Sequence, residues 1–470
     1  MNKYKYLIEN VIVFALGNVF SKVVVFLLLA VYTQYLSPQE FGDAELVVTT
    51  ISLLIPIFTL SISDATLRFL FGDESKKTVV SNGIVVTILG CIVLISLIPL
   101  MMMFESIEPY IYYICFLFSS NSVEQLFFSV DKGLEKVKIC AFNSVVSVAT
   151  LTISSYFLIV ESHLGLKGYL LSMVLSHLVS AIYLFISGRL YRYIHIDDID
   201  ISLIKQMLCY SIPFVPSTIA WWINSLSDRY LIVIFLGSTI NGLYSAAAKI
   251  PNIISIFTTI FHQAWQLSGI KEYKDESYST FYSNIYSIFN LLIVTFSSLS
   301  LLLLPYLSIW LFKGEFVNSW KYTPFLILGA LFSGLSGVLS PAYMAVKKTN
   351  ILMVSTIVGA LINILLNILF LQLFGVQVAA ISTFLSFVVL WFIRVRLIKK
   401  YVDVKVNWFL VGFNSFILIC ESLFVIQDSR YFLFVNIGLF IIILAVNYIL
   451  VKSIVDKTVS SLLTKIKLIN

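Results

Sequence analysis

Long apolar runs, separated by short polar segments, follow one another along the whole chain. Each run is about 19–29 residues long, which is enough for a helix to cross a hydrocarbon core of ~30 Å. The pattern therefore predicts an all-α integral membrane protein with about 14 transmembrane helices. These spans are expected at residues 10–33, 44–63, 79–103, 109–130, 140–160, 169–187, 208–236, 242–266, 281–304, 323–346, 351–371, 377–396, 406–426 and 432–451.

A short motif recurs at the outer turns that follow the first and seventh spans. Tyr35–Gly42 and Phe235–Gly242 both contain an aromatic residue followed by Leu, with a Gly six residues after the Leu, at an offset of 200 residues. Six spans separate the copies, so both halves enter the membrane in the same direction, and a site is expected between them. We therefore expect an N-terminal six-helix bundle with its linker, a second six-helix bundle, and a two-helix hairpin with a tail, at residues 1–206, 207–400 and 401–470.

The basic residues set the expected orientation of these spans. With the N-terminus placed inside, 24 of the 31 Lys and Arg residues fall in cytoplasmic segments, four in outer loops and three within spans. Such a bias predicts cytoplasmic N- and C-termini. The same bias accounts for the net charge of +6, so the charge does not indicate a nucleic-acid partner. Anionic membrane lipids would also favour basic residues on the cytoplasmic side. The first span is too long for the core of a signal peptide and lacks a cleavage site, so we expect it to be retained.

The short loops exclude several classes of protein. Only 12% of the residues are charged, and the longest predicted loops have roughly 18 residues, which leaves no room for a soluble catalytic domain. No P-loop, GxSxG or HExxH motif is present. The five cysteines lie in or beside spans without close pairing, so we interpret them as apolar packing residues and predict neither disulfides nor a metal site.

Spans 7 and 8 carry the clearest internal polar positions. Asp228 and Arg229 lie about eight residues below the outer end of span 7, and Lys249 lies about seven residues below that of span 8. At ~1.5 Å per residue they share one level of the outer half. Asn252 continues a polar stripe along span 8, which favours a wet cavity over a lipid-facing helix. Either Asp228 merely neutralises a neighbouring cation, or these residues bind a ligand.

Four further charged residues lie within spans of the first half or at their ends. Lys22 lies near the middle of span 1, where an ammonium group needs a partner, water or a ligand. Asp64 and Arg68 are four residues apart and could pair along one helix face, unless Arg68 extends to the interface. Glu124, in span 4, could pair with a cation or carry a coupling proton. His177 is expected to be a hydrogen-bonded packing residue, with a coupling role as the alternative.

Other polar residues within spans favour close helix packing. Asn363 and Asn367 are spaced by four residues in span 11, and Ser382, Thr383 and Ser386 lie in span 12. They could also line a path for sugars, but packing is the preferred interpretation. Overall, we expect a polar cavity with net positive charge. That chemistry suits an anionic head group that carries sugars, because Arg and Lys match phosphate oxygens.

Five segments resemble the polysaccharide-transport, Wzx-type flippases of the multidrug/oligosaccharidyl-lipid/polysaccharide exporter superfamily. The resemblance covers most of residues 1–400 and rests on the order and spacing of Tyr35–Gly42, Ile212–Pro216, Ser227–Tyr230, Gly242–Ala247 and Lys249–Pro251. It implies two six-helix bundles around a central cavity, with two additional C-terminal helices.

The resemblance also implies a function. Such proteins move undecaprenyl-pyrophosphate-linked oligosaccharides to the outer leaflet of the bacterial inner membrane for O-antigen or capsule synthesis, and a polymerase and chain-length machinery are possible partners. We expect a transporter and not an enzyme, with no cofactor beyond H⁺ or Na⁺ as a coupling ion. The expected substrate-binding residues are Lys22, Arg68, Asp228, Arg229, Lys249 and Asn252. The candidates for coupling are Asp64, Glu124 and Asp228.

Three other functions remain open. An ion-coupled multidrug exporter of the same superfamily would place more acid in the cavity. A flippase for the peptidoglycan precursor would place more Arg in the first two spans, which here hold only Lys22 and Arg68. A membrane polysaccharide polymerase or ligase would need a large outer loop with catalytic residues, and no such loop is predicted.

Overall fold

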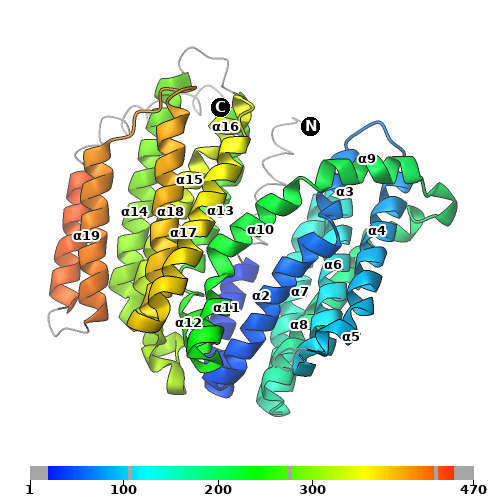
Figure 1. Ribbon diagram of the computed structural model, residues 1–470, viewed down its shortest axis with the longest axis horizontal. Coiled ribbons are helices and arrows are strands. Elements are labelled where there is room, and N and C mark those ends of the chain that lie inside the picture. The colour runs from blue at the N-terminus through cyan, green and yellow to red at the C-terminus, as the bar shows by residue number, and fades with distance from the viewer. Residues whose placement is uncertain (1–19, 104–107, 272–277, 428–431, 449–470) are drawn as a thin grey trace, which may run out of the picture. The chain divides into compact units, whose positions relative to one another are not determined.

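The computed structural model describes residues 20–103, 108–271, 278–427 and 432–448. Helices account for all of the regular structure in these ranges, and no strand occurs in them (Figure 1). The predicted all-α class is therefore confirmed. Both predicted cytoplasmic ends, with Lys3, Lys5 and the basic residues from Lys452 onward, lie outside the described residues.

The chain divides into two compact units. The first unit extends to Trp222 and also takes in Gly237–Gly242, and the second contains Ile223–Leu236 and the residues from Leu243 onward. The predicted boundaries at residues 206/207 and 400/401 stay predictions. The first unit holds a helix at Phe20–Tyr35, then α2 Pro38–Phe58, α3 Ile62–Phe69, α4 Lys76–Ser96, α5 Ile98–Met101, α6 Ile111–Gly133, α7 Val137–Ser155, α8 Gly165–Ser187, α9 Ile201–Ser211 and most of α10 Phe214–Leu226.

The second unit continues with helices of more varied length. α18 packs against both α15 and α17, and α14 packs on α19 (Figure 1). Its helices are α11 Asp228–Leu236, the remainder of α12 Ser238–Ala247, α13 Asn252–Lys271, α14 Tyr278–Leu311, α15 Thr323–Val338, α16 Ser340–Ala345, α17 Asn350–Phe374, α18 Gln377–Ile398, α19 Trp408–Ile426 and a last helix at Phe432–Tyr448.

Nine helices of the described ranges are long and apolar enough to cross a membrane, and ten are if one bent pair counts as a single span. Three shorter apolar helices, Phe20–Tyr35, Asn252–His262 and Phe432–Tyr448, add to them. The protein is therefore a multi-pass membrane protein, and these numbers are compatible with the predicted 14 spans.

Several predicted spans are broken instead of continuous. Span 7 falls in the apolar pair Ile201–Leu226 and Asp228–Leu236, which is bent by 47° at Ser227. Span 8 breaks between Ala247 and Asn252, where Pro251 cannot donate the backbone hydrogen bond that would continue the helix. Span 2 ends at Phe58, and Leu60 and Ser61 adopt left-handed conformations before α3 begins. Asp228, Lys249 and Asp64 therefore lie beside helix breaks and not in the middle of regular helices.

The segment predicted as a central cytoplasmic linker is partly helical. Residues 189–206 contain two short 3₁₀ turns and the first half of α9, whose Leu203 and Met207 are buried against α3 and α4. The side chain of Asn82 on α4 bonds both the N–H (3.0 Å) and the carbonyl (3.2 Å) of Asp200. These contacts fix α9 to the first unit.

The two copies of the repeated motif contact each other within the first unit. A Cβ added to Gly42 would lie 2.1 Å from the carbonyl oxygen of Ser238, and one added to Gly242 would lie 1.8 Å from that of Pro38. Nδ2 of Asn241 donates to the Gly42 carbonyl at 2.8 Å. The recurring Gly is therefore required because the first turns of α2 and α12 approach each other too closely for any side chain.

Candidate functional site

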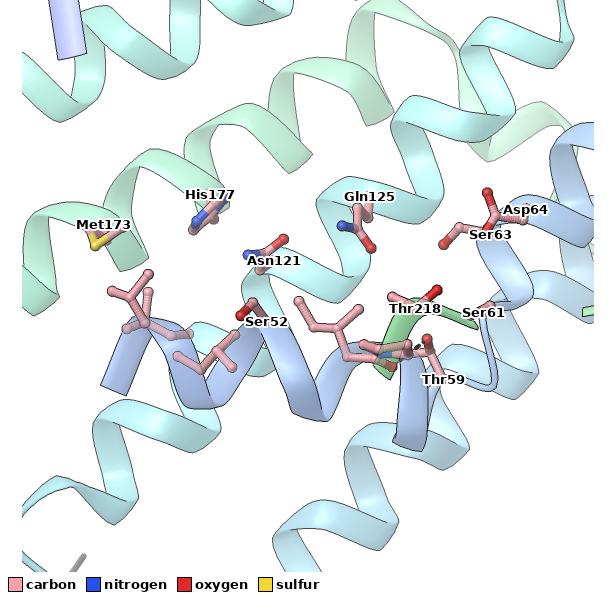
Figure 2. Close-up of a pocket in the computed structure, with 15 residues that line it drawn as sticks. Ser52, Thr59, Ser61, Ser63, Asp64, Asn121, Gln125, Met173, His177 and Thr218 are labelled. Carbon is pink, nitrogen blue, oxygen red and sulfur yellow. Dashed lines mark hydrogen bonds between the residues drawn. The ribbon is translucent and has the colours of Figure 1, made fainter. Parts of the chain in front are cut away.

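A polar cavity of about 290 Å³ lies inside the first unit. Polar side chains from α6 and α8 follow one another along it, opposite hydroxyl groups from α2 and α10 (Figure 2). Its lining contains no Lys or Arg; the titratable residues are Asp64 and His177. The lining residues are Val48, Ile51, Ser52, Ile55, Pro56, Thr59, Ser61, Ser63, Asp64, Leu117, Asn121, Gln125, Met173, His177 and Thr218.

Helical spacing brings the lining residues to the cavity. Leu117, Asn121 and Gln125 are four residues apart on α6, so they share one face, and Met173 and His177 do the same on α8. The break after α2 adds the hydroxyl groups of residues 59, 61 and 63. The spacing on α6 is readable in the sequence, but it does not reveal which face of α6 meets a cavity.

The polar groups of the lining differ in what they already bind. The Ser52 hydroxyl donates to the Thr49 carbonyl at 2.7 Å and accepts from Nε1 of Trp222 at 3.1 Å, which fixes α10 to α2. The Thr218 hydroxyl donates to the carbonyl of Phe214 at 3.1 Å. In the part of the chain that the structure describes, the amides of Asn121 and Gln125 make no side-chain hydrogen bond. They remain available to a ligand or to water.

Glu124 and His177 form an ion pair or charge-assisted hydrogen bond beside this cavity. Nδ1 of His177 lies 2.5 Å from Oε2 of Glu124, and Nδ2 of Asn143 donates to Oε1 at 3.1 Å. Helices α6, α7 and α8 thus meet at one carboxyl group. His177, expected mainly as a packing residue, is hydrogen-bonded as predicted, but it also reaches the cavity.

The other predicted residues of the first unit are exposed. Asp64 and Arg68 both lie on α3, and no ion pair joins them among the described residues, which leaves the alternative that Arg68 extends to the interface. Asp64 is exposed and lines the cavity, and Arg68 is exposed on the next turn of α3. Lys22 is exposed on the first helix, whereas the hydroxyl of the adjacent Ser21 donates to the Ser144 carbonyl at 2.7 Å.

Asp228 anchors a buried polar network in the second unit. It is the first residue of α11, and its carboxylate accepts hydrogen bonds from the Tyr244 hydroxyl and, at 3.3 Å, from the Thr383 hydroxyl. Its Oδ1 accepts from the N–H of Arg229 at 3.0 Å. The network continues because Nδ2 of Asn363 donates to the Thr383 hydroxyl at 3.2 Å. A buried carboxylate thus receives the donors that it needs.

The amides of α17 extend this network. Nδ2 of Asn367 donates to the Ser382 hydroxyl at 2.8 Å, and the Ser227 hydroxyl donates to Oδ1 of Asn363 at 3.4 Å. Both asparagines are fully buried between α17 and α18. The predicted preference for packing is therefore confirmed at these positions, although they also connect to Asp228.

The remaining predicted residues lie around the helix breaks of the second unit. Arg229 follows Asp228 on α11 and is partly buried. Lys249 lies in the turn between α12 and α13 and is also partly buried, while Asn252 opens α13 and is exposed. The Asp228 network thus unites one predicted residue with several that were interpreted as packing residues.

Three charged side chains that the sequence did not single out are buried against neutral partners. Glu45 on α2 is 1% exposed and accepts a 2.8 Å hydrogen bond from the Tyr169 hydroxyl. Glu421 on α19 is buried against α14, where the Ser298 hydroxyl donates to it at 2.6 Å. Arg394, counted among the cytoplasmic basic residues, donates to Ser355, Thr356 and two backbone carbonyls. Each is hydrogen-bonded to neutral groups that are distant in sequence, so the pattern of residues along the chain does not reveal these partners.

Solved structures share this fold. A lipid II flippase in an inward closed conformation superposes with a TM-score of 0.71 over 94% of this chain and 100% of its own, at 14% identity. An inward-facing multidrug resistance transporter of the multidrug/oligosaccharidyl-lipid/polysaccharide exporter superfamily gives a TM-score of 0.64 over 81% of this chain and 96% of its own, also at 14% identity. At these identities the likeness concerns the fold alone.

Sequence comparison gives the family. A probable low-salt glycan biosynthesis flippase of Haloferax volcanii is 24% identical over 214 residues, which are 44% of this chain. The alignment spans 45% of that relative, less than half of its length. The family described as polysaccharide biosynthesis protein matches residues 7–266, more than half of the chain. The chain therefore belongs to the polysaccharide biosynthesis protein family.

Proposed function

We propose that the protein is a flippase that moves undecaprenyl-pyrophosphate-linked oligosaccharides from the cytoplasmic to the outer leaflet of a bacterial inner membrane. The observation that carries this proposal is the family match over residues 7–266. The named function of the archaeal relative and the fold shared with a lipid II flippase support it. Its product would serve O-antigen or capsule synthesis, and both chain termini would be cytoplasmic.

The proposed mechanism is alternating access with separate groups for substrate and coupling ion. Lys22, Arg229 and Lys249 supply the positive charge that a pyrophosphate requires, and Arg68 is proposed to attract it from the inner side. Asn252 is exposed and can donate to phosphate or sugar oxygens. The undecaprenyl chain remains in the bilayer throughout, so the protein moves only the polar part of the substrate.

Coupling is proposed to use acids that bind H⁺ or Na⁺. Asp228 is supported by its buried network of hydroxyl and amide groups, and Glu124 by its contact with His177 beside a polar cavity. Asp64 lines that cavity and is exposed to it. A proton or sodium ion bound at one of these carboxylates changes the local charge by one unit, which can bias one conformation over another.

The substrate assignment is tested by replacing Arg229 and Lys249 together with Ala. We expect surface polysaccharide to fall to near the level of a deletion strain while the protein remains in the membrane at its normal level. A matched control replaces the exposed Lys399 and Lys400, which removes two positive charges elsewhere. Normal export from the Arg229→Ala/Lys249→Ala variant would contradict the assignment of these two residues.

A multidrug exporter remains the second candidate. The cavity of the first unit favours it in one respect, because its lining contains Asp64 and neither Lys nor Arg. An exporter for cationic drugs predicts that deletion sensitises cells to organic cations and leaves surface polysaccharide unchanged. A polymerase or ligase predicts that the purified protein extends glycan chains. A flippase predicts neither result.

A further inference from the structure

The cavity of the first unit has a chemistry that differs from the one expected for a pyrophosphate site. We propose that it is a sugar subsite, which binds one or two uncharged sugar rings of the lipid-linked oligosaccharide while the phosphates bind elsewhere. This inference rests on the proposed function and deepens it. The residues that carry it are Asn121 and Gln125 on α6, with Asp64 and Ser63 on α3 and His177 on α8 (Figure 2).

Hydrogen-bonding capacity is the first argument. Asn121 and Gln125 each offer two N–H donors and a carbonyl acceptor, and within the described ranges neither side chain uses them on protein. Sugar hydroxyl groups both donate and accept, so adjacent hydroxyls match a side-chain amide. The hydroxyls of Ser52 and Thr218 already donate to backbone carbonyls, and each still has capacity to accept.

Charge is the second argument. Pyrophosphate is recognised by Arg and Lys, and no such residue is present in the lining of this cavity. The carboxylate of Asp64 would repel a phosphate but can accept from two neighbouring sugar hydroxyls. Since Glu124 holds Nδ1 of His177, the other ring nitrogen remains for the cavity side. The lining therefore selects against the anionic part of the substrate and not against its neutral part.

Size and apolar lining are the third argument. About 290 Å³ is close to the lower end of the ~300–1,000 Å³ typical of small-molecule pockets, which suits one or two rings and excludes a long repeat unit. Aliphatic side chains line the remainder and can cover the C–H faces of a sugar ring; they are Val48, Ile51, Ile55, Leu117 and Met173. Such a mixture of few polar groups on apolar walls is typical of specific ligand sites.

The test uses full-length protein in lipid nanodiscs and two lipid probes. One is undecaprenyl pyrophosphate without sugar, and the other is the sugar-bearing lipid extracted from a strain that lacks this protein. The variant is Asn121→Ala/Gln125→Ala, which leaves no buried partner unpaired, so it is expected to fold. The control is Gln206→Ala/Asn318→Ala, which removes two exposed amides outside the cavity.

We expect the Asn121→Ala/Gln125→Ala variant to bind the sugar-bearing lipid at least about tenfold more weakly, since two amides each lose hydrogen bonds to the sugar. Its affinity for undecaprenyl pyrophosphate should change by less than about twofold. Unchanged affinity for the sugar-bearing lipid, or an equal loss for both lipids, would overturn the subsite. Tetraphenylphosphonium is a third probe: if the variant loses binding of this cation and not of the sugar-bearing lipid, the cavity is a cation site and the proposal is wrong.

Failure of the proposed function gives a different result. If the wild-type protein binds neither lipid probe more tightly than a bulk phospholipid, the flippase assignment fails and the subsite fails with it. If the wild-type protein prefers the sugar-bearing lipid and the Asn121→Ala/Gln125→Ala variant keeps that preference, the flippase assignment stands and only the subsite is lost.

Discussion

Asp228 illustrates how this protein keeps an ionisable side chain inside a membrane bundle. The residue is 3% exposed, and donors from α12 and α18 converge on its carboxylate. An unpaired charge at that depth would cost several kcal/mol, so the neighbours are needed for the fold as well as for any function. Because Asp228 opens α11, the positive end of the helix dipole also faces it.

The contribution of Tyr244 can be measured separately from that of Asp228. Tyr244→Phe removes the hydroxyl that donates to the carboxylate and leaves the ring in place. We expect the free energy of unfolding to fall by about 1–3 kcal/mol, because a buried acceptor loses a donor. Thermal unfolding of the purified protein would show this as a lower midpoint.

The control is Tyr112→Phe, since Tyr112 lies 60% exposed on α6. It should leave the midpoint almost unchanged. Equal midpoints for the Tyr244 variant and the wild type would show that Asp228 does not depend on the Tyr244 hydroxyl.

At the level of helices, the contact between the first turns of α2 and α12 is the tightest feature of the first unit. Gly42 and Gly242 each face a backbone carbonyl at a distance that no Cβ can occupy. Ser37 caps α2 through a reciprocal pair of hydrogen bonds with Glu40, which fixes where that helix begins. The repeated motif thus encodes two helix starts that fit only against each other.

Adding a methyl group to either glycine is predicted to disrupt this contact. Gly42→Ala and Gly242→Ala should each reduce the amount of folded protein and lower its thermal midpoint, because the opposing backbone must move by about 1.5 Å to restore ordinary contact. Gly412→Ala on α19 is the control, since nothing lies within 4 Å of its added Cβ and Ala favours the helix. Wild-type stability of both variants would mean that the two turns do not pack in this way in the protein.

The sequence predicted helices much better than it predicted their interruptions. The length of an apolar run is enough to identify a helical span. A run that crosses the membrane has no water to bind its backbone groups, so it must form a helix that bonds them internally. The bend at Ser227 and the left-handed residues Leu60 and Ser61 carry no comparable signal. The breaks at Pro99, Pro251 and Pro341 do follow from a residue that cannot continue a helix.

The candidate site was predictable to a similar extent. Asp228 and Glu124 can be singled out in the sequence because a charged side chain within an apolar span is costly unless it has partners. The structure shows hydrogen-bond partners for both. Asn121 and Gln125 escaped notice, since uncharged polar residues are common where helices pack. Which of them faces a cavity depends on helices that are distant in sequence, and no local pattern contains that information.

For the whole molecule, two properties support a transporter for a polar substrate. Its described helices include nine long enough to cross a membrane, and they carry polar clusters in both units. The family assignment supports the proposed substrate class, while the distribution of Lys and Arg gives the expected orientation of the protein in the membrane.

The most direct test of the flippase assignment is the sidedness of lipid-linked oligosaccharides in a strain from which the gene has been deleted. We predict that undecaprenyl-pyrophosphate-linked units accumulate on the inner leaflet and that surface polysaccharide is lost, with both defects corrected by the wild-type gene. Units that still reach the outer leaflet, together with unchanged surface polysaccharide, would contradict the assignment.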